Sequence, residues 1–263
     1  MTAAVLEARA RAWFDAHPGP VPGRLDWLAQ AESTNSVLLQ RVALDARGEA
    51  LLAEQQTAGR GRLGRRWQAE PGGSLCLSLG LPWPEGPRLA ATLSLAIAAA
   101  SGEVLRELGA GDVGLKWPND LWARGRKLGG LLLELGGSVT TPSMVIGLGL
   151  NLDLPEQFSP GQDWIDLARL LAPGGLPDRA ELAARLLRAW LQAIEQLRAE
   201  GAAPLLTRWR TLDALAGQTV RVQAGDLQRT GRALGIDAQG RLRVAHADGE
   251  CCYSSAEISL RPA

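Results

Sequence analysis

The chain has 263 residues, and 46% of them are hydrophobic, which is enough for a sizeable buried core. Lys and Arg number 28, as do Asp and Glu, so the formal net charge is zero, which argues against a protein that coats nucleic acid. Cys76, Cys251 and Cys252 form neither a disulfide framework nor a zinc spacing, and we expect a cytoplasmic protein.

The first half of the chain predicts alternating helices and strands. The N-terminus carries acidic residues and has no apolar core segment, so it is not a signal peptide. Ser33, Thr34 and Asn35 are good N-cap residues before an apolar-periodic run. In chain order, the pattern predicts a helix over 2–16, a strand over 24–30, a helix over 32–46, strands over 49–56 and 74–81, and a long helix over 87–108. Its Ala-rich stretch 89–100 is too short to cross a membrane, and no membrane partner is expected.

The second half of the chain predicts more strands, then two helices, and finally a region of short strands and tight turns. Asp178 and Glu181 resemble a capping box at a helix start. The expected elements are strands over 113–117, 120–124, 126–137 and 143–152, and helices over 177–200 and about 203–216. From Gly217 onward, short strand-like pieces alternate with tight turns, which is typical of a small β-barrel. We therefore predict an α+β chain with one domain over 1–216 and a second over 217–263.

The segment GRGRLGRRW (59–67) joins two predicted core strands. Its glycines let the backbone approach a ligand closely, and its arginines can grip a phosphate or a carboxylate. A solvated basic loop and an RG-rich RNA-binding segment remain alternatives. The segment is not a P-loop, because it lacks the Gly-Lys-Ser/Thr ending.

The segment KWPNDLW (116–122) places Lys116 at a strand end, before Asn119 and Asp120 in a turn. A lysine beside an Asn-Asp pair suits a phosphate and its magnesium, although Pro-Asn-Asp turns are also common for structural reasons. Lys127 precedes an apolar strand. It is either a buried lysine facing a carboxylate or an edge lysine that blunts a sheet, and taken alone the edge interpretation is favoured.

The glycines of GLGLNL (147–152) suggest a close approach to a ligand beside Asn151, or only a bulge. The two histidines, His17 and His246, lie outside all these motifs, which argues against Ser-His-Asp or Cys-His chemistry and a histidine-bound metal. The four motifs supply arginine, lysine, asparagine and aspartate side chains but no histidine base. Such a set suits a reaction whose nucleophile is already ionised. A carboxylate that attacks the α-phosphate of ATP is such a nucleophile.

Five segments together resemble the biotin protein ligase family in their order and spacing. They are STN (33–35), EQQTAGRGRLGRRW (54–67), KWPNDL (116–121), RKLGG (126–130) and GLGLNL (147–152). The resemblance implies a mixed sheet with helices, related to class II aminoacyl-tRNA synthetases, and a small C-terminal SH3-like barrel. It also implies two half-reactions. Biotin and MgATP give biotinyl-5′-AMP and pyrophosphate, and a lysine of a biotin carboxyl carrier domain then takes the biotinyl group.

The resemblance also implies roles for individual residues. Asp120 is the implied magnesium ligand, and Arg62, Lys116 and Lys127 are the implied catalytic residues. The implied biotin contacts are Ser33, Thr34, Asn35, Gln56, Arg60, Gly61, Arg62 and Lys127. The implied ATP and adenylate contacts are Arg62, Arg65, Trp67, Lys116, Asn119 and Asn151.

This sequence departs from the family pattern at two places. About 24 residues precede the first matching strand, too few for the DNA-binding domain of some members, so a monofunctional ligase without a DNA partner is expected. Leu63 stands where some members have arginine. A lipoate–protein ligase or octanoyl transferase of the same fold is the closest rival, an RNA-binding module is a rival of another class, and a homodimer is possible.

Overall fold

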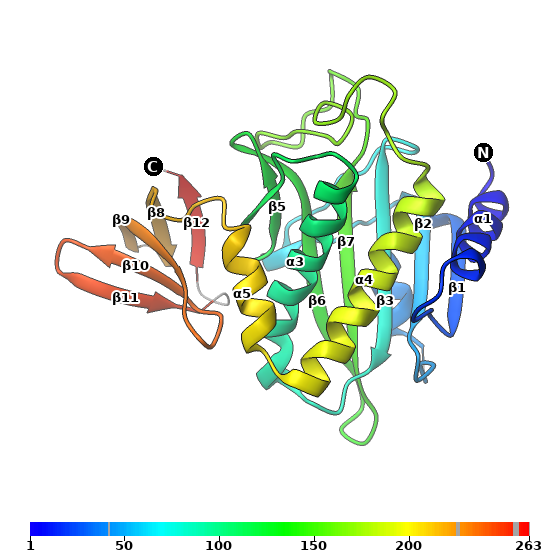
Figure 1. Ribbon diagram of the computed structural model, residues 1–263, viewed down its shortest axis with the longest axis horizontal. Helices are drawn as coiled ribbons and strands as arrows, with labels where there is room; N and C mark the ends of the chain where they lie inside the picture. The colour runs from blue at the N-terminus through cyan, green and yellow to red at the C-terminus, as the bar shows by residue number, and fades with distance from the viewer. Residues whose placement is uncertain (42, 225–226, 255–257, 263) are drawn as a thin grey trace.

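The computed structural model describes residues 1–41, 43–224, 227–254 and 258–262. Its main body is a seven-stranded sheet in the order β1-β2-β3-β7-β6-β5-β4 (Figure 1). The strands are β1 (Arg24–Ala31), β2 (Glu49–Gln56), β3 (Ser74–Pro82), β4 (Gly114–Lys116), β5 (Asp120–Ala123), β6 (Arg126–Gly137) and β7 (Pro142–Asn151). β1 and β2 pair in parallel and all other neighbours pair antiparallel, so the predicted mixed sheet is confirmed.

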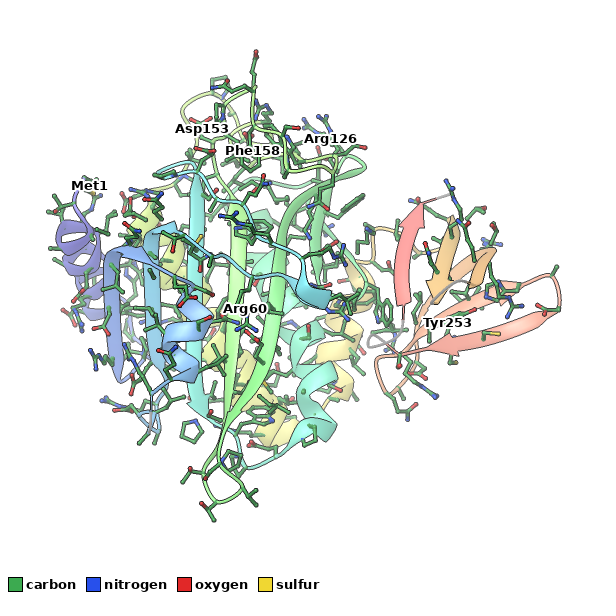
Figure 2. All side chains as sticks on the ribbon, turned by 180° about the vertical axis from the view of Figure 1, so that it is seen from behind. Met1, Arg60, Arg126, Asp153, Phe158 and Tyr253 are labelled. Atoms are coloured by element: carbon green, nitrogen blue, oxygen red, sulfur yellow. The ribbon has the colours of Figure 1, made fainter. Side chains whose placement is uncertain are left out.

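Three helices cover one face of this sheet, α3 (Ala90–Glu107), α4 (Arg179–Glu200) and α5 (Ala203–Thr211), and α1 (Ala3–Ala16) packs near its β1 edge (Figure 1). A 3₁₀ turn, η2 (Pro87–Leu89), leads into α3. The opposite face carries the short α2 (Thr34–Leu39) (Figure 2). The residues of β3 from Ser74 to Leu81 are all buried, because helices cover one face of this central strand and α2 packs on the other.

Two helix boundaries differ from the prediction. The helix predicted over 32–46 ends at Leu39, because Arg41 turns toward the carboxylates of Asp26 (2.8 Å) and Glu49. The predicted helix over 203–216 ends at Thr211. Tertiary ion pairs outweigh the local helical pattern in the first case. The predicted start of α4 is confirmed, since Asp178 accepts hydrogen bonds from the first-turn N–H groups.

The C-terminal part is a five-stranded antiparallel sheet in the order β11-β10-β9-β8-β12. Its strands are β8 (Thr219–Ala224), β9 (Leu227–Ile236), β10 (Leu242–His246), β11 (Gly249–Tyr253) and β12 (Ile258–Pro262). The predicted small β domain is confirmed as an antiparallel sheet that lies beside α5 (Figure 1), and its closure into an SH3-like barrel stays a prediction. The boundary between domains at residue 216 stays a prediction.

The β9–β10 turn contacts the main body at the Trp117–Pro118 turn. Trp117 is buried, its Nε1 donates to Gly240 O (3.0 Å), and its peptide bond to Pro118 is cis. Arg210 of α5 also donates to Ile236 O (3.3 Å). The C-terminal sheet therefore supports the segment that carries Asn119 and Asp120. Among the described residues, no helix has the length and apolar character needed to span a membrane.

Candidate active site

A cavity of about 490 Å³ lies between α2, the ends of β2 and β4, and strands β6 and β7. The cavity is on the sheet face opposite α3 and α4, where the Arg60 side chain lies over β6 (Figure 2). All but one of the predicted site residues line it, namely Ser33, Thr34, Asn35, Gln56, Arg60, Gly61, Arg62, Arg65, Trp67, Lys116, Asn119, Asp120 and Lys127. The fold thus brings together five motifs that are far apart in the sequence.

One end of the cavity is built from uncharged hydrogen-bonding groups. Thr34 N donates to Gln56 Oε1 (2.8 Å), and Thr34 Oγ1 lies 3.2 Å from the same oxygen. Ser78 Oγ donates to Asn35 Oδ1 (2.6 Å) and lies 2.7 Å from Thr34 Oγ1. Ser33 is the N-cap of α2, yet its side chain makes no capping bond. Ser33, Thr34 and Asn35, which predicted a helix start, therefore line the cavity.

The other end is cationic and is organised around Asp120. Lys127 Nζ lies 2.8 Å from Asp120 Oδ1, and Lys116 Nζ lies 3.8 Å from Asp120 Oδ2. Arg62 Nη1 donates to Asn119 Oδ1 (3.2 Å). Burial lowers the pKa of Arg62, while the nearby Asp120 charge favours its cationic form. One carboxylate thus holds two ammonium groups in fixed positions.

The position of Lys127 corrects the prediction of an edge lysine. Lys127 is in β6, which pairs with β5 on one side and β7 on the other, and its side chain is only 15% exposed. Lys116 is equally sheltered, at 13% exposure. The chain contains only these two lysines, against 26 arginines, and both line the cavity.

Residues 59–67, which we call the arginine loop, fold into a small hairpin over the cavity. Arg60 and Arg66 form an isolated β-bridge, and Trp67 N donates to Gly59 O (3.0 Å). At the tip, the 3₁₀ turn η1 (Arg62–Gly64) contains Leu63 in the left-handed region with φ 56°. Leu63 and Gly64 at the tip are exposed, and Leu63 faces an adjoining groove rather than the main cavity.

The glycines of β7 make room for protein side chains. A Cβ at Gly147 would lie 2.2 Å from Asn35 Oδ1, and one at Gly149 would lie 2.2 Å from the Trp67 indole. Asn35 and Trp67 fill the space beside these glycines in this structure, and the predicted close approach to a ligand stays a prediction. Cys76 lies beside Trp67 and Gln56, and burial raises the pKa of its thiol to about 12, although both neighbours favour the thiolate.

Asn151 is the predicted site residue that does not reach the main cavity. It is buried, and its Nδ2 donates to Ile165 O (3.0 Å) and Lys127 O (3.4 Å). It lines a small adjoining cavity of about 30 Å³ behind Trp67. Its amide fastens β6 and the 163–165 segment to the end of β7, and its contact with a nucleotide stays a prediction.

Sequence reasoning missed two polar residues behind the cavity wall. Ser78 is fully buried in β3, and Glu134 in β6 bonds Arg60 and Asn35. Each is a polar residue inside an otherwise apolar strand, in SLCLSLGL and RKLGGLLLELGG. This interruption of the apolar pattern is the signal that could have identified them.

A magnesium ion would find one carboxylate on the cavity wall. Asp120 is the only acidic residue that lines the cavity, and no cluster of three metal-binding side chains occurs among the described residues. Magnesium is commonly held by one or two carboxylates together with substrate phosphates. Asp120 therefore fits a metal that arrives with a nucleotide, and does not form a resident metal site by itself.

The sequence and the fold were compared with those of known proteins. Residues 27–151 match the model of the Biotin/lipoate A/B protein ligase family, and residues 216–261 match the Biotin protein ligase C terminal domain. The chain is 41% identical over 244 residues to the Bifunctional ligase/repressor BirA of Escherichia coli, covering 92% of this chain and 75% of that protein.

Two further relatives cover most of both chains. Biotin--[acetyl-CoA-carboxylase] ligase of Mycobacterium tuberculosis is 41% identical over 235 residues, covering 83% of this chain and 82% of that protein. The Aquifex aeolicus biotin protein ligase solved in complex with biotin and ATP has a TM-score of 0.80 and 27% identity, and the match covers 92% of this chain and all of that one.

Proposed function

This chain belongs to the biotin/lipoate A/B protein ligase family, and we propose that its cavity activates biotin with ATP before transfer to a carrier protein. The protein is a biotin–[acetyl-CoA-carboxylase] ligase. One observation carries the proposal for the cavity: uncharged polar groups gather at one end of it, and six cationic side chains are among the residues that line it. A ligand with a neutral ureido ring, a carboxylate and phosphates has the same distribution of groups.

In the proposed first step, an oxygen of the biotin carboxylate attacks the α-phosphorus of ATP. The new O–P bond forms as the bond to the bridging oxygen of the β-phosphate breaks, and pyrophosphate leaves. The carboxylate is already ionised, so no general base is needed, and positioning and charge stabilisation supply the catalysis. The absence of histidine among the cavity-lining residues agrees with this chemistry.

We assign residues to this step by their position in the cavity. Ser33, Thr34, Asn35 and Gln56 bind the ureido head. Lys127 offsets the charge that moves as the acyl phosphate forms. Arg60, Gly61 and Arg62 of the arginine loop contact biotin, and Arg62 also reaches the phosphates. The remaining contacts to the phosphates and adenine come from Arg65, Trp67, Lys116 and Asn119. Magnesium bound with ATP at Asp120 would neutralise phosphate charge.

In the second step, a neutral lysine amine of a biotin carboxyl carrier domain attacks the acyl carbon of the mixed anhydride. An amide bond forms, the bond from the acyl carbon to the phosphate oxygen breaks, and AMP leaves. The arginine loop covers the cavity, and it would exclude water from an anhydride that hydrolyses readily.

The test is biotin-dependent exchange of labelled pyrophosphate into ATP by the purified protein. We expect exchange with biotin and little with lipoate or octanoate. Labelling of a carrier domain should need biotin and ATP together. Exchange with lipoate in place of biotin would favour a lipoate ligase, while RNA binding with no exchange would contradict the proposal.

A further inference from the structure

We propose that Glu134 is a positioning residue that locks the arginine loop onto the neutral end of the cavity and thereby retains the activated intermediate. This inference rests on the proposed function. Glu134 does not line the cavity, so it would act through the residues that it holds.

The two carboxylate oxygens of Glu134 bind two different parts of the molecule. Oε1 accepts from Arg60 Nη2 in the arginine loop (2.6 Å), and Oε2 accepts from Asn35 Nδ2 at the start of α2 (2.9 Å). Glu134 itself is on β6, so its side chain joins three elements. Its side chain is 17% exposed, which limits screening of the ion pair by solvent.

Asn35 extends this connection into the cavity wall. Its Oδ1 accepts from the fully buried Ser78, whose hydroxyl lies 2.7 Å from Thr34 Oγ1. Thr34 in turn binds Gln56 through its backbone N–H. A hydrogen-bonded chain therefore runs from the arginine loop to the groups we assign to the ureido ring. Occupation of the neutral end and closure of the loop are expected to favour each other.

The remaining contacts of Arg60 show why Glu134 matters for the loop. Arg60 Nη1 reaches Ser36 Oγ at 3.4 Å, a long neutral contact, while the Glu134 contact is short and charge-assisted. Arg62 attaches the far side of the loop to Asn119. Without the carboxylate, the loop keeps that attachment but loosens above the neutral end.

The experiment replaces Glu134 with glutamine in the full chain. The adenylate is formed on the enzyme from labelled biotin and MgATP, and an unlabelled chase then reports its release. We expect release about 3- to 10-fold faster than in the parent, the range for a partly exposed ion pair plus one hydrogen bond. The first-turnover rate of adenylation should stay within about twofold, since Glu134 does not touch the reacting groups.

The matched control is Glu85→Gln. Glu85 pairs with Arg198 at 2.7 Å with similar exposure, and neither residue lines the cavity. This variant should release the adenylate at the parental rate. A double-mutant cycle then separates the contact of Glu134 with Arg60 from its contact with Asn35. If Glu134 acts through Arg60, Glu134→Gln should change the rate of adenylate release less than about twofold in an Arg60→Ala background.

Parental release by folded Glu134→Gln would overturn the inference. So would an undiminished effect in the Arg60→Ala background, or a loss of adenylation without faster release. If Glu134→Gln does not fold, Arg60→Gln tests the same contact from its more exposed side. Failure of the parent to form any adenylate would instead contradict the proposed function.

Discussion

The cavity has two cationic walls that are built differently. Lys116 on β4 and Lys127 on β6 lie on strands that both pair with β5, share one carboxylate and are each at least 85% buried. The arginine loop is a local hairpin, and its side chains at positions 60, 65 and 66 are exposed. The strand wall is fixed before a ligand arrives, while the loop wall depends on a few side-chain contacts. Fixed charges suit chemistry, and a movable cover suits entry and release.

The largest effect should come from the strand wall. We expect Lys127→Ala to slow adenylation by about 10²- to 10³-fold, the scale of losing one preorganised donor. Biotin affinity can fall as well, because the same ammonium would pair with the ground-state carboxylate. Pre-steady-state adenylation is the measurement. Arg126→Ala is the control, since Arg126 is exposed and lies outside the main cavity. A folded Lys127→Ala within about threefold of the parent would remove Lys127 from the catalytic step.

The reactivity of the Cys76 thiol reports how closed the sheet is behind Trp67 and Gln56. At a pKa of about 12, only about one Cys76 in 10⁴ is a thiolate at pH 8, and its side chain is also buried. Burial raises the pKa, so the folded state favours the neutral thiol throughout the ordinary pH range. Iodoacetamide should label exposed Cys252 at least 10-fold faster than Cys76, with mass spectrometry of peptides as the readout. Comparable rates would show that the structure around Cys76 opens readily.

Limited proteolysis reports on the loop wall. Glycines beside mutually repelling arginines provide few contacts that favour one conformation, so we expect trypsin to cut near residues 59–66 in the ligand-free protein. Biotin with MgATP should slow that cleavage several-fold, because the ligand adds contacts that exist only in the closed arrangement. Equal protection with and without ligand would contradict the comparison between the walls.

The smallest effect is expected at the loop tip. Leu63 is 66% exposed and points away from the main cavity, so restoring an arginine there should change adenylation less than about threefold. Steady-state kinetics of Leu63→Arg can check this. An increase in the adenylation rate of more than about threefold would mean that the loop tip moves into the cavity when the ligand binds.

The sequence predicted most of this site because its residues carry visible chemistry in fixed motifs. It could not predict that Arg41 ends α2 early, since its partners Asp26 and Glu49 meet it only in the folded sheet. The local pattern alone favoured an edge position for Lys127 for the same reason, because strand order decides which strands are at an edge, whereas the family resemblance placed Lys127 in the site. Glu134 and Ser78 were missed since their partners come from segments about 40 to 100 residues away.

The restriction of lysine to Lys116 and Lys127 also limits self-modification. An acyl adenylate reacts with neutral amines, and an arginine guanidinium stays protonated and does not compete. Both ammonium groups face Asp120 inside the cavity, and every other cationic side chain except the two histidines is an arginine. An acyl adenylate that left the cavity would therefore meet no lysine amine elsewhere in this sequence.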